Sequence, residues 1–336
     1  MKLHDFYYEL PKELIAQAPL NERDMSRLMV LDRADESVTE KKFRDIVHYI
    51  KKGDCLVLNN TRVVPVRLYG QRQTGGKVEI FILDPYSDKP RALVRPSKRI
   101  KDGEKISLGK AGEVLILGKA DLGRFVRFSM PIREVLKYGH IPLPPYISRE
   151  DTKEDAECYQ TVYARKDGAT ASPTAGLHFT GALLDKLTKN GVSIVYVTLH
   201  TSYGTFAPVT ALDIENHLMH KEYYELEDDS ARVINNVKNA GGRIFSVGTT
   251  STRVLETCTR EPGRVFPGGG ETNLFIYPGY KFKIVDAVIT NFHFPESTLL
   301  MLVSAFSGRE FILKAYRQAV RDKFRFFSYG DAMLII

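Results

Sequence analysis

The 336-residue sequence has no tryptophan and only three cysteines, Cys55, Cys158 and Cys258, which lie far apart. No two of them form a Cys-x-x-Cys pair, so the pattern favours a reducing cytoplasm over a disulfide framework. The longest apolar run, residues 299–303, is far too short to cross a membrane. The first ten residues carry several charges and no apolar segment, so no signal peptide is expected.

Motifs of several common enzyme classes are missing as well. The chain has no G-x-G-x-x-G or G-x-x-x-x-G-K-[ST] run, which argues against a standard dinucleotide site or a P-loop, and no G-x-S-x-G elbow. His217-Leu-Met-His220 has the spacing of two helical metal ligands, but no cysteine lies near it and H-E-x-x-H is absent. No metal site is therefore expected.

The length is enough for roughly two domains with a substantial core. Lysine and arginine total 48 against 41 aspartate and glutamate, a net charge of +7. A basic balance of this size is weak support for a polyanionic partner, since many basic proteins bind no nucleic acid.

The middle of the chain is typical of a small β domain. Six short apolar runs are separated by glycine turns, with no long helix between them, which predicts an antiparallel barrel or sandwich. The predicted strands are 63–69, 77–83, 91–94, 105–108, 113–117 and 125–128. Ile141-Pro-Leu-Pro-Pro-Tyr-Ile147 is then a stiff, extended return hinge. We assign residues 63–149 to an inserted β domain, and 1–62 plus 150–336 to a discontinuous larger domain.

Helix and strand patterns alternate in the rest of the chain, which predicts a largely parallel sheet, open or closed. The predicted strands are 28–31, 56–58, 192–199, 243–247 and 286–290, and the predicted helices are 43–52, 183–189, 298–306, one from 228 and one over 311–320.

Polar residues follow several of these strands, where α/β proteins bind ligands. Gly248-Thr-Thr-Ser-Thr-Arg253 is predicted as a turn before a helix at residue 254, suited to an anion or a nucleoside hydroxyl, or else simple helix capping. Asn59-Asn-Thr-Arg62 is either a ligand site or a plain turn. Asn291 and His293 come after another strand, and His293 is either a general base or a structural histidine.

Gly168-Ala-Thr-Ala-Ser-Pro-Thr-Ala-Gly-Leu-His-Phe179 is built from small residues and runs into a predicted helix. Such a loop lets a ligand approach the backbone closely, with His178 beside it. A tight surface loop with a structural histidine is the alternative.

Two further stretches carry interleaved charges. Arg95-Pro-Ser-Lys-Arg-Ile-Lys101 is either a phosphate-binding cluster or an ordinary charged loop. Phe324-Arg-Phe-Phe-Ser-Tyr-Gly-Asp331 interleaves arginine with aromatics, which suits base stacking beside a charge, or a C-terminal strand with its rings in the core.

Taken together, the motifs resemble the S-adenosylmethionine:tRNA ribosyltransferase-isomerase family of queuosine biosynthesis almost from end to end. The similar segments include Asn59 with Thr61-Arg62-Val63, His140 to Ile147, Tyr159-Gln-Thr-Val-Tyr163, Pro173 to Phe179, Gly204-Thr-Phe206, Val247-Gly-Thr-Thr-Ser251 with Arg253, Thr290-Asn-Phe-His293, Ser297 to Val303 and Tyr329 to Leu334. The chain departs from the family at Thr201-Ser202-Tyr203, where a Val-Gly pair is usual, and at Ser172, where alanine is usual.

The resemblance implies a distorted barrel-like α/β domain with a small antiparallel β-barrel domain inserted. It also implies the reaction: the ribosyl part of S-adenosylmethionine is transferred to 7-aminomethyl-7-deazaguanine at the tRNA wobble position and isomerised. The products are epoxyqueuosine in tRNA, adenine and methionine. S-adenosylmethionine is then a consumed cosubstrate, and no bound prosthetic group is expected.

Proton transfers in this reaction need two or three acid/base groups. The candidates are His178 and His293, with Asp331 as a carboxylate partner. Thr249, Thr250, Ser251 and Arg253 are expected to bind S-adenosylmethionine, with Arg253 on its methionine carboxylate. Asn60, Arg62 and Asn291 are expected to orient the ribose or the deazaguanine.

Contact with tRNA phosphates is assigned to Lys98, Arg99 and Lys101. A monomer without membrane attachment is expected. Two rival classes remain: a non-catalytic RNA-binding protein on the same scaffold, and a conventional S-adenosylmethionine methyltransferase, against which the missing glycine-rich turn argues.

Overall fold

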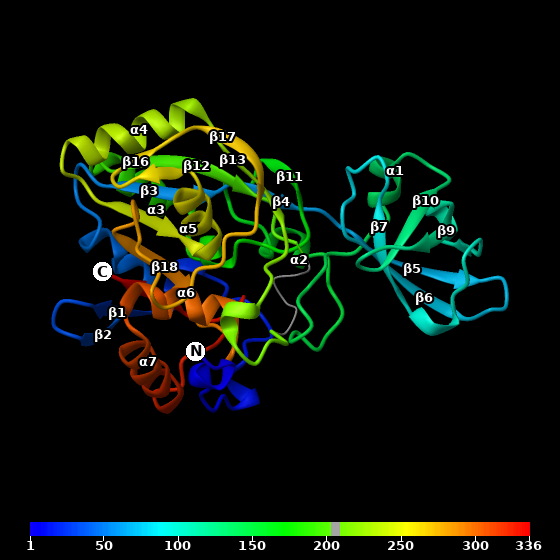
Figure 1. Ribbon diagram of the computed structural model, residues 1–336, viewed down its shortest axis with the longest axis horizontal. Helices are drawn as coiled ribbons and strands as arrows, with labels where there is room; N and C mark the ends of the chain where they lie inside the picture. Colours follow the sequence, from blue (N-terminus) through cyan, green and yellow to red (C-terminus); the bar gives the residue numbers. More distant parts are fainter. Residues whose placement is uncertain (203–208) are drawn as a thin grey trace.

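The structure is a computed structural model that describes residues 1–202 and 209–336. Figure 1 shows a small β-barrel at the right and a larger α/β part at the left, which holds both chain ends. The predicted fold class, an α/β protein with an inserted small antiparallel β-barrel, is confirmed. Within the described ranges, no helix has the length and apolar character needed to span a bilayer.

The barrel is closed and antiparallel, with strand order β10-β7-β6-β5-β8-β9. Its strands are β5 (Arg67–Arg72), β6 (Lys77–Ile82), β7 (Arg91–Arg95), β8 (Lys105–Ser107), β9 (Glu113–Lys119) and β10 (Arg124–Phe128), and helix α1 (Ile132–Leu136) follows. In β6, Val78, Ile80 and Ile82 are buried on the inside, as the period of two requires. All six predicted strands are present inside the stretch 63–149, and this domain boundary stays a prediction.

The larger part is built on a nine-stranded mixed sheet of order β17-β13-β12-β3-β14-β18-β19-β1-β2. Its strands are β1 (Arg27–Asp32), β2 (Ser37–Lys42), β3 (Cys55–Asn59), β12 (Ser193–Leu199), β13 (Glu222–Leu226), β14 (Ile244–Val247), β17 (Gly268–Thr272), β18 (Ala287–Asn291) and β19 (Ala332–Ile335). Four neighbours, β12, β3, β14 and β18, run parallel. Their carboxyl ends therefore meet at one edge of the sheet.

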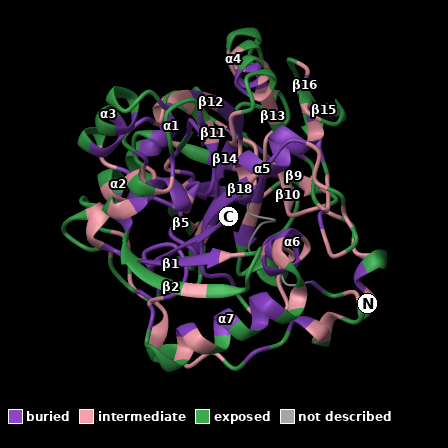
Figure 2. Cartoon of the chain, turned by 90° about the vertical axis from the view of Figure 1, so that its left-hand side faces the viewer, coloured by how far each residue is buried: buried purple, intermediate pink, exposed green. Residues whose placement is uncertain are grey.

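Helices cover both faces of this sheet, which explains why β3, β14, β18 and β19 are buried along their whole length. The helices are α2 (Asp155–Cys158), α3 (Gly181–Lys189), α4 (Asp228–Asn239), α5 (Gly248–Thr257), α6 (Thr298–Ser307) and α7 (Arg309–Arg321). Two small pairs complete the fold: β4 (Thr61–Val63) with β11 (Lys166–Ala169), and β15 (Thr259–Glu261) with β16 (Arg264–Val265). In Figure 2 the central strands are buried, and the outward faces of α3 and α4 are exposed.

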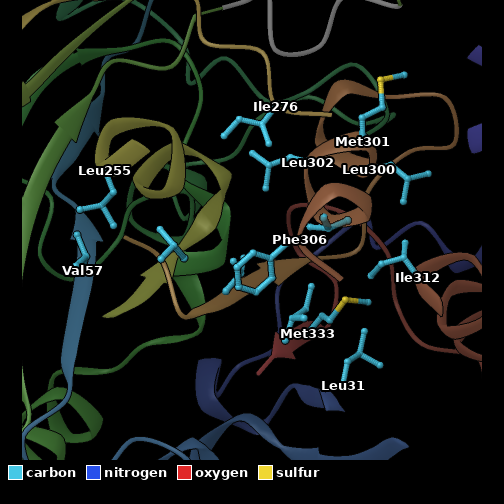
Figure 3. Packing of buried hydrophobic residues seen from close by; sticks show 14 of the residues in the cluster. Leu31, Val57, Leu255, Ile276, Leu300, Met301, Leu302, Phe306, Ile312 and Met333 are labelled. Atoms are coloured by element: carbon cyan, nitrogen blue, oxygen red, sulfur yellow. The ribbon is translucent and has the colours of Figure 1, made fainter. Parts of the chain in front are cut away.

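Successive residues of β3 serve two different cores. Cys55 and Val57 pack with α4 to α7, whereas Leu56 and Leu58 pack with α3 and the 3-10 helix Phe43–His48. Figure 3 shows the first core, with Leu302 and Phe306 of α6 among the side chains that fill it. This alternation is the normal consequence of a strand covered on both sides.

Two predicted elements differ from the structure. The amphipathic helix predicted over 43–52 is a 3-10 helix, Phe43–His48, whose tighter turn aligns Phe43 and Ile46, three residues apart, on the buried side. The turn predicted from Gly248 to Arg253 is already helical, because α5 begins at Gly248. Gly248 adopts a φ of +82°, and the Thr252 hydroxyl bonds back to its carbonyl at 3.1 Å, so one hydroxyl of this segment is paired within the helix.

Candidate active site

A cavity of about 510 Å³ lies where the parallel strands β14 and β18 end. Its volume is in the range of small-molecule sites, and its place at the carboxyl ends of the strands is the usual one for ligands in α/β proteins. The loop predicted to admit a ligand contributes one wall, with Ala171, Ser172, Pro173, Thr174 and Ala175. The other walls include Tyr146, Thr201, Gly248, Thr249, Thr250, Asn291, His293, Phe294, Glu296, Phe327 and Ser328.

The N-terminus of α5 opens onto this cavity through Thr249 and Thr250. No side chain caps this helix end, so its first backbone N–H groups are available to a ligand. Three hydroxyl oxygens on the wall, those of Ser172, Thr201 and Thr250, are buried and have no hydrogen-bond partner in the described part of the chain. An unpaired buried hydroxyl costs about 1–3 kcal/mol, so a polar ligand that bonded to these groups would stabilise the site.

Ser251, predicted to bind substrate, is fully buried, also lacks a partner among the described residues, and does not line the cavity.

His293 lies on the cavity wall and is buried. Its Nε2 is 2.9 Å from the Thr290 hydroxyl, while its backbone N–H donates to the Tyr316 hydroxyl at 3.0 Å. Nδ1 has no hydrogen-bond partner among residues 1–202 and 209–336. Burial lowers the pKa of His293 to about 3, so the ring is neutral at neutral pH.

His178 is also buried, but it lies behind the cavity wall, in a separate small cavity of about 70 Å³. The Asn291 amide donates to its Nε2 at 3.1 Å, so the ring carries its proton on Nδ1, which contacts the Ser26 hydroxyl at 2.8 Å. The ring stacks on Phe43, with 4.9 Å between centroids. Desolvation lowers its pKa to about 3.

Asn291 connects these two places. It lines the large cavity, accepts a hydrogen bond from the Thr174 hydroxyl at 3.1 Å, and donates to His178 and to the Phe327 carbonyl, each at 3.1 Å. Every polar group of this amide is therefore used within the protein, and Asn291 holds three segments of the wall together.

Three other predicted site residues lie outside both cavities. Asp331 is buried and accepts the backbone N–H groups of Arg27 at 2.9 Å and Arg325 at 2.8 Å, and burial raises its pKa. Asn60 accepts a 2.8 Å bond from the Thr198 hydroxyl. Arg62 is exposed, donates to the Ala164 carbonyl at 2.9 Å and lies 3.7 Å from Asp167. In this structure all three connect protein segments.

Arg253 is buried one helical turn behind the cavity wall and pairs with the buried carboxylate of Glu222. It also donates to the Leu274 carbonyl at 3.0 Å, and its Nη2 has no partner among the described residues. Glu222 in turn accepts the backbone N–H of Ser202 at 2.9 Å. The predicted contact of Arg253 with a methionine carboxylate stays a prediction.

The predicted RNA-binding residues lie on the barrel. Lys98 and Arg99 are in the 3-10 turn Ser97–Arg99 and Lys101 follows it, all of them exposed. None of the three forms an ion pair within the described ranges, whereas nearby Lys105 and Arg124 do. The cluster therefore presents three positive side chains to solvent that form no close ion pair in the described part of the chain.

Several wall residues were not predicted as site residues. Ser172 and Thr201 stood out only as departures from a family pattern, Tyr146 belonged to a predicted hinge, and Phe294 sits between His293 and a proline. Phe327 lay in a stretch for which base stacking and core packing were both open; it lines the cavity, while Phe324 and Phe326 are in the core. Tyr203 and Gly204-Thr-Phe206 lie outside the described residues.

The His217 ring packs edge-on against Phe275, with 5.3 Å between centroids. No three histidine, cysteine, aspartate or glutamate side chains among residues 1–202 and 209–336 are grouped so as to hold a metal ion.

The fold and site define an α/β protein with a small-molecule cavity at its strand ends and an inserted, cation-bearing β-barrel. A sequence model of the family described as "Queuosine biosynthesis protein" matches residues 3–335. The chain belongs to this family.

Curated relatives extend the match over the whole length. Proteins called S-adenosylmethionine:tRNA ribosyltransferase-isomerase from Acetivibrio thermocellus and Caldanaerobacter subterraneus are 53% and 51% identical over 344 residues, with 100% of each chain covered. A crystal structure of S-adenosylmethionine tRNA ribosyltransferase from Thermotoga maritima is similar with a TM-score of 0.58 and 37% identity, covering 99% of this chain and 100% of that one.

Proposed function

We propose that this chain transfers and isomerises the ribosyl moiety of S-adenosylmethionine onto 7-aminomethyl-7-deazaguanine at the tRNA wobble position. Epoxyqueuosine-tRNA, adenine and methionine are the products. The relatives named for this enzyme are about half identical to the chain and match it from end to end. The observation that carries the proposal is the 510 Å³ cavity, whose wall combines unpartnered hydroxyls, a neutral histidine and aromatic rings.

S-adenosylmethionine has groups that match this wall. Its carboxylate and ribose hydroxyls are partners for Thr249, Thr250 and the open end of α5. Its sulfonium and ammonium are positive, and Glu296 is the acidic side chain on the described part of the wall. Arg253 acts from behind this wall: through Glu222 it holds the Ser202 backbone beside Thr201, a wall residue. S-adenosylmethionine is consumed here, and no prosthetic group is part of the proposal.

His293 is the group placed to move protons. The reaction needs a proton removed beside the sulfonium, assistance to the departing adenine, and deprotonation of the attacking amine. Its neutral imidazole lines the cavity and has one ring nitrogen without a partner among the described residues, so it can form a hydrogen bond with a substrate and relay a proton. His178 acts through Asn291, whose amide it orients, and is a positioning residue. Asp331 supports the same region by holding the backbone of Arg27 and Arg325.

The inserted domain, residues 63–149, supplies the tRNA contact through Lys98, Arg99 and Lys101. Each phosphate neutralised by a cation makes binding more sensitive to salt. Replacing the three residues by glutamate should therefore weaken tRNA binding and reduce the slope of log Kd against log salt by about 2–3. The matched control replaces Lys105 and Arg124, which already have carboxylate partners. Equal losses in both variants would refute the assignment. We place this activity in the cytoplasm, where tRNA serves translation, and we propose that the protein acts as a monomer.

The reaction itself is tested by product analysis. The protein is incubated with S-adenosylmethionine and a tRNA that carries the aminomethyl-deazaguanine, and the small molecules are separated by chromatography. Adenine and methionine should appear in equal amounts, and only with the modified tRNA. S-adenosylhomocysteine would indicate a methyltransferase instead, and tRNA binding without adenine release would indicate an RNA-binding protein without this activity.

A further inference from the structure

Three aromatic rings form a connected group on the wall of the large cavity. Phe294 stacks on Phe327 with 3.6 Å between centroids and 26° between planes, and Tyr146 packs against both, at 5.3 Å and 4.8 Å. All three line the cavity. We call Tyr146, Phe294 and Phe327 the aromatic platform. They come from three distant segments, so the tertiary fold alone brings them together.

One residue of the aromatic platform, Phe327, has an unfavourable backbone conformation. Phe327 has a φ of +69°, in the left-handed region, which is a clear outlier for a bulky residue. Such a conformation is unfavourable by itself and persists when the surroundings enforce it. Here the Asn291 amide donates to the Phe327 carbonyl at 3.1 Å, and the Tyr146 hydroxyl is bound to Ser328 at 2.5 Å. Strain of this kind collects at ligand-binding sites.

Phe294 keeps one part of its ring free. It is 39% exposed, although it lines a cavity and its neighbours Phe292 and His293 are buried. The unpartnered hydroxyls of Ser172, Thr201 and Thr250 lie on the same cavity. A ligand that satisfies the whole wall therefore needs a flat aromatic portion and a polar portion in one molecule.

We propose that the aromatic platform stacks the adenine of S-adenosylmethionine and holds it until the glycosidic bond breaks. This inference rests on the proposed function and adds the residues that recognise the base. One molecule of S-adenosylmethionine carries both portions: adenine for Phe294, and ribose hydroxyls and carboxylate for the hydroxyl-bearing wall. Stacking of a base on an aromatic side chain strengthens binding by roughly five- to 150-fold. The other planar base of the reaction, the deazaguanine, enters attached to tRNA and has polar groups of its own, so separate KM values for S-adenosylmethionine and for tRNA distinguish the two bases.

Because the chain has no tryptophan, the fluorescence of a single introduced tryptophan can report directly on binding at the platform. Phe294→Trp places a single tryptophan on the platform of an otherwise tryptophan-free chain. Its fluorescence should change saturably with S-adenosylmethionine and with adenosine, and should not respond to methionine. The matched control is Tyr138→Trp, at a 47% exposed tyrosine that does not line the cavity, and it should respond to none of them.

Kinetics identify which base is stacked. Phe294→Leu keeps an apolar side chain without a π face, and it should raise KM for S-adenosylmethionine about tenfold while KM for tRNA stays within twofold. A rise in KM for tRNA alone would assign the platform to the deazaguanine and overturn the proposal. No change in either KM, or no fluorescence response, would overturn it as well. Because the fluorescence titration needs no turnover, absence of adenine release by the unmodified protein would reject the proposed function without deciding the adenine site.

Discussion

His178 and His293 lie in two regions of the molecule that are alike by every local measure. Both histidines are buried, and desolvation lowers the pKa of both from 6.5 to about 3. The difference lies in their partners: both ring nitrogens of His178 contact protein side chains, whereas His293, which lines the large cavity, has one such contact among residues 1–202 and 209–336. A buried histidine with an altered pKa is therefore not by itself a catalytic candidate. What separates the two is the hydrogen-bonding capacity left for a ligand.

The largest effect should come from His293. His293→Gln keeps a polar side chain of similar size but removes an ionisable ring, and it should lower kcat about 10²-fold or more, the usual contribution of a general acid or base. KM for S-adenosylmethionine should change little. Adenine release under saturating substrates measures this, with His200→Gln as control, because His200 lies outside the cavity and contacts Thr61 at 2.8 Å. Equal losses of kcat in His293→Gln and His200→Gln would contradict a catalytic role for His293.

His178 is expected to contribute to the stability of the fold more than to the chemical step. His178→Ala removes a stacked ring and one hydrogen-bond partner each from the Asn291 amide and the Ser26 hydroxyl, so it should lower the free energy of unfolding by about 3 kcal/mol. Urea denaturation measures this. The same assay on His293→Gln should show a loss of about 1 kcal/mol or less. If His178→Ala instead kept full stability and abolished adenine release, His178 would be the catalytic base and the comparison would reverse.

Lowering the pH should reduce the free energy of unfolding through both histidines in the same way. In the unfolded chain a histidine binds a proton below about pH 6.5, while the folded protein resists protonation until about pH 3. The unfolded state thus binds more protons in this window, and stability is lost as pH falls, by about 1.4 kcal/mol per pH unit for each histidine. Urea denaturation between pH 7 and pH 5 should give this slope, and His178→Asn should reduce it. An unchanged slope in that variant would contradict a buried, neutral His178.

The smallest effects should come from the unpartnered hydroxyls. Ser172→Ala and Thr250→Val remove buried oxygens that have no protein partner in the described part of the chain, so stability should stay within about 0.5 kcal/mol or rise. If a ligand pairs with them, each substitution should weaken S-adenosylmethionine binding by about 1 kcal/mol, or about fivefold, in calorimetry. Thr252→Val is the control, because that hydroxyl bonds to the Gly248 carbonyl and its loss should cost stability. Unchanged binding in both cavity variants would mean that no ligand group reaches this wall.

Much of the architecture follows from local pattern. Continuous apolar runs such as Cys55–Asn59 became strands buried on both faces, and alternation such as Lys77–Ile82 became a barrel strand. Thr180 and Ser297 begin α3 and α6 by accepting Leu183 and Leu300 backbone N–H groups, as capping residues do. These features depend on neighbours within a few residues, which the sequence displays directly.

The site was predicted only in outline. Polar residues after β14 and β18 pointed to the correct edge of the sheet, because parallel strands bring their carboxyl ends together. The sequence did not separate Thr250, on the cavity, from Ser251, buried behind it, since helical rotation about α5 decides which side chain faces the ligand. Nor did it distinguish His178 from His293, because both lie in short segments that mix small or polar residues with one apolar residue, Leu177 or Phe292.

The sequence by itself determined the fold class, the strands of the barrel and the edge of the sheet where ligands bind. Only the tertiary structure decided which of those polar groups remain free. His178 is taken up by Ser26, 152 residues away, and Arg253 by Glu222, 31 residues away, while Phe294 and Phe327 meet beside the cavity. A polar group forms its hydrogen bond with a partner that lies within about 3 Å. For residues far apart in the sequence, that distance is set by the packing of the whole chain.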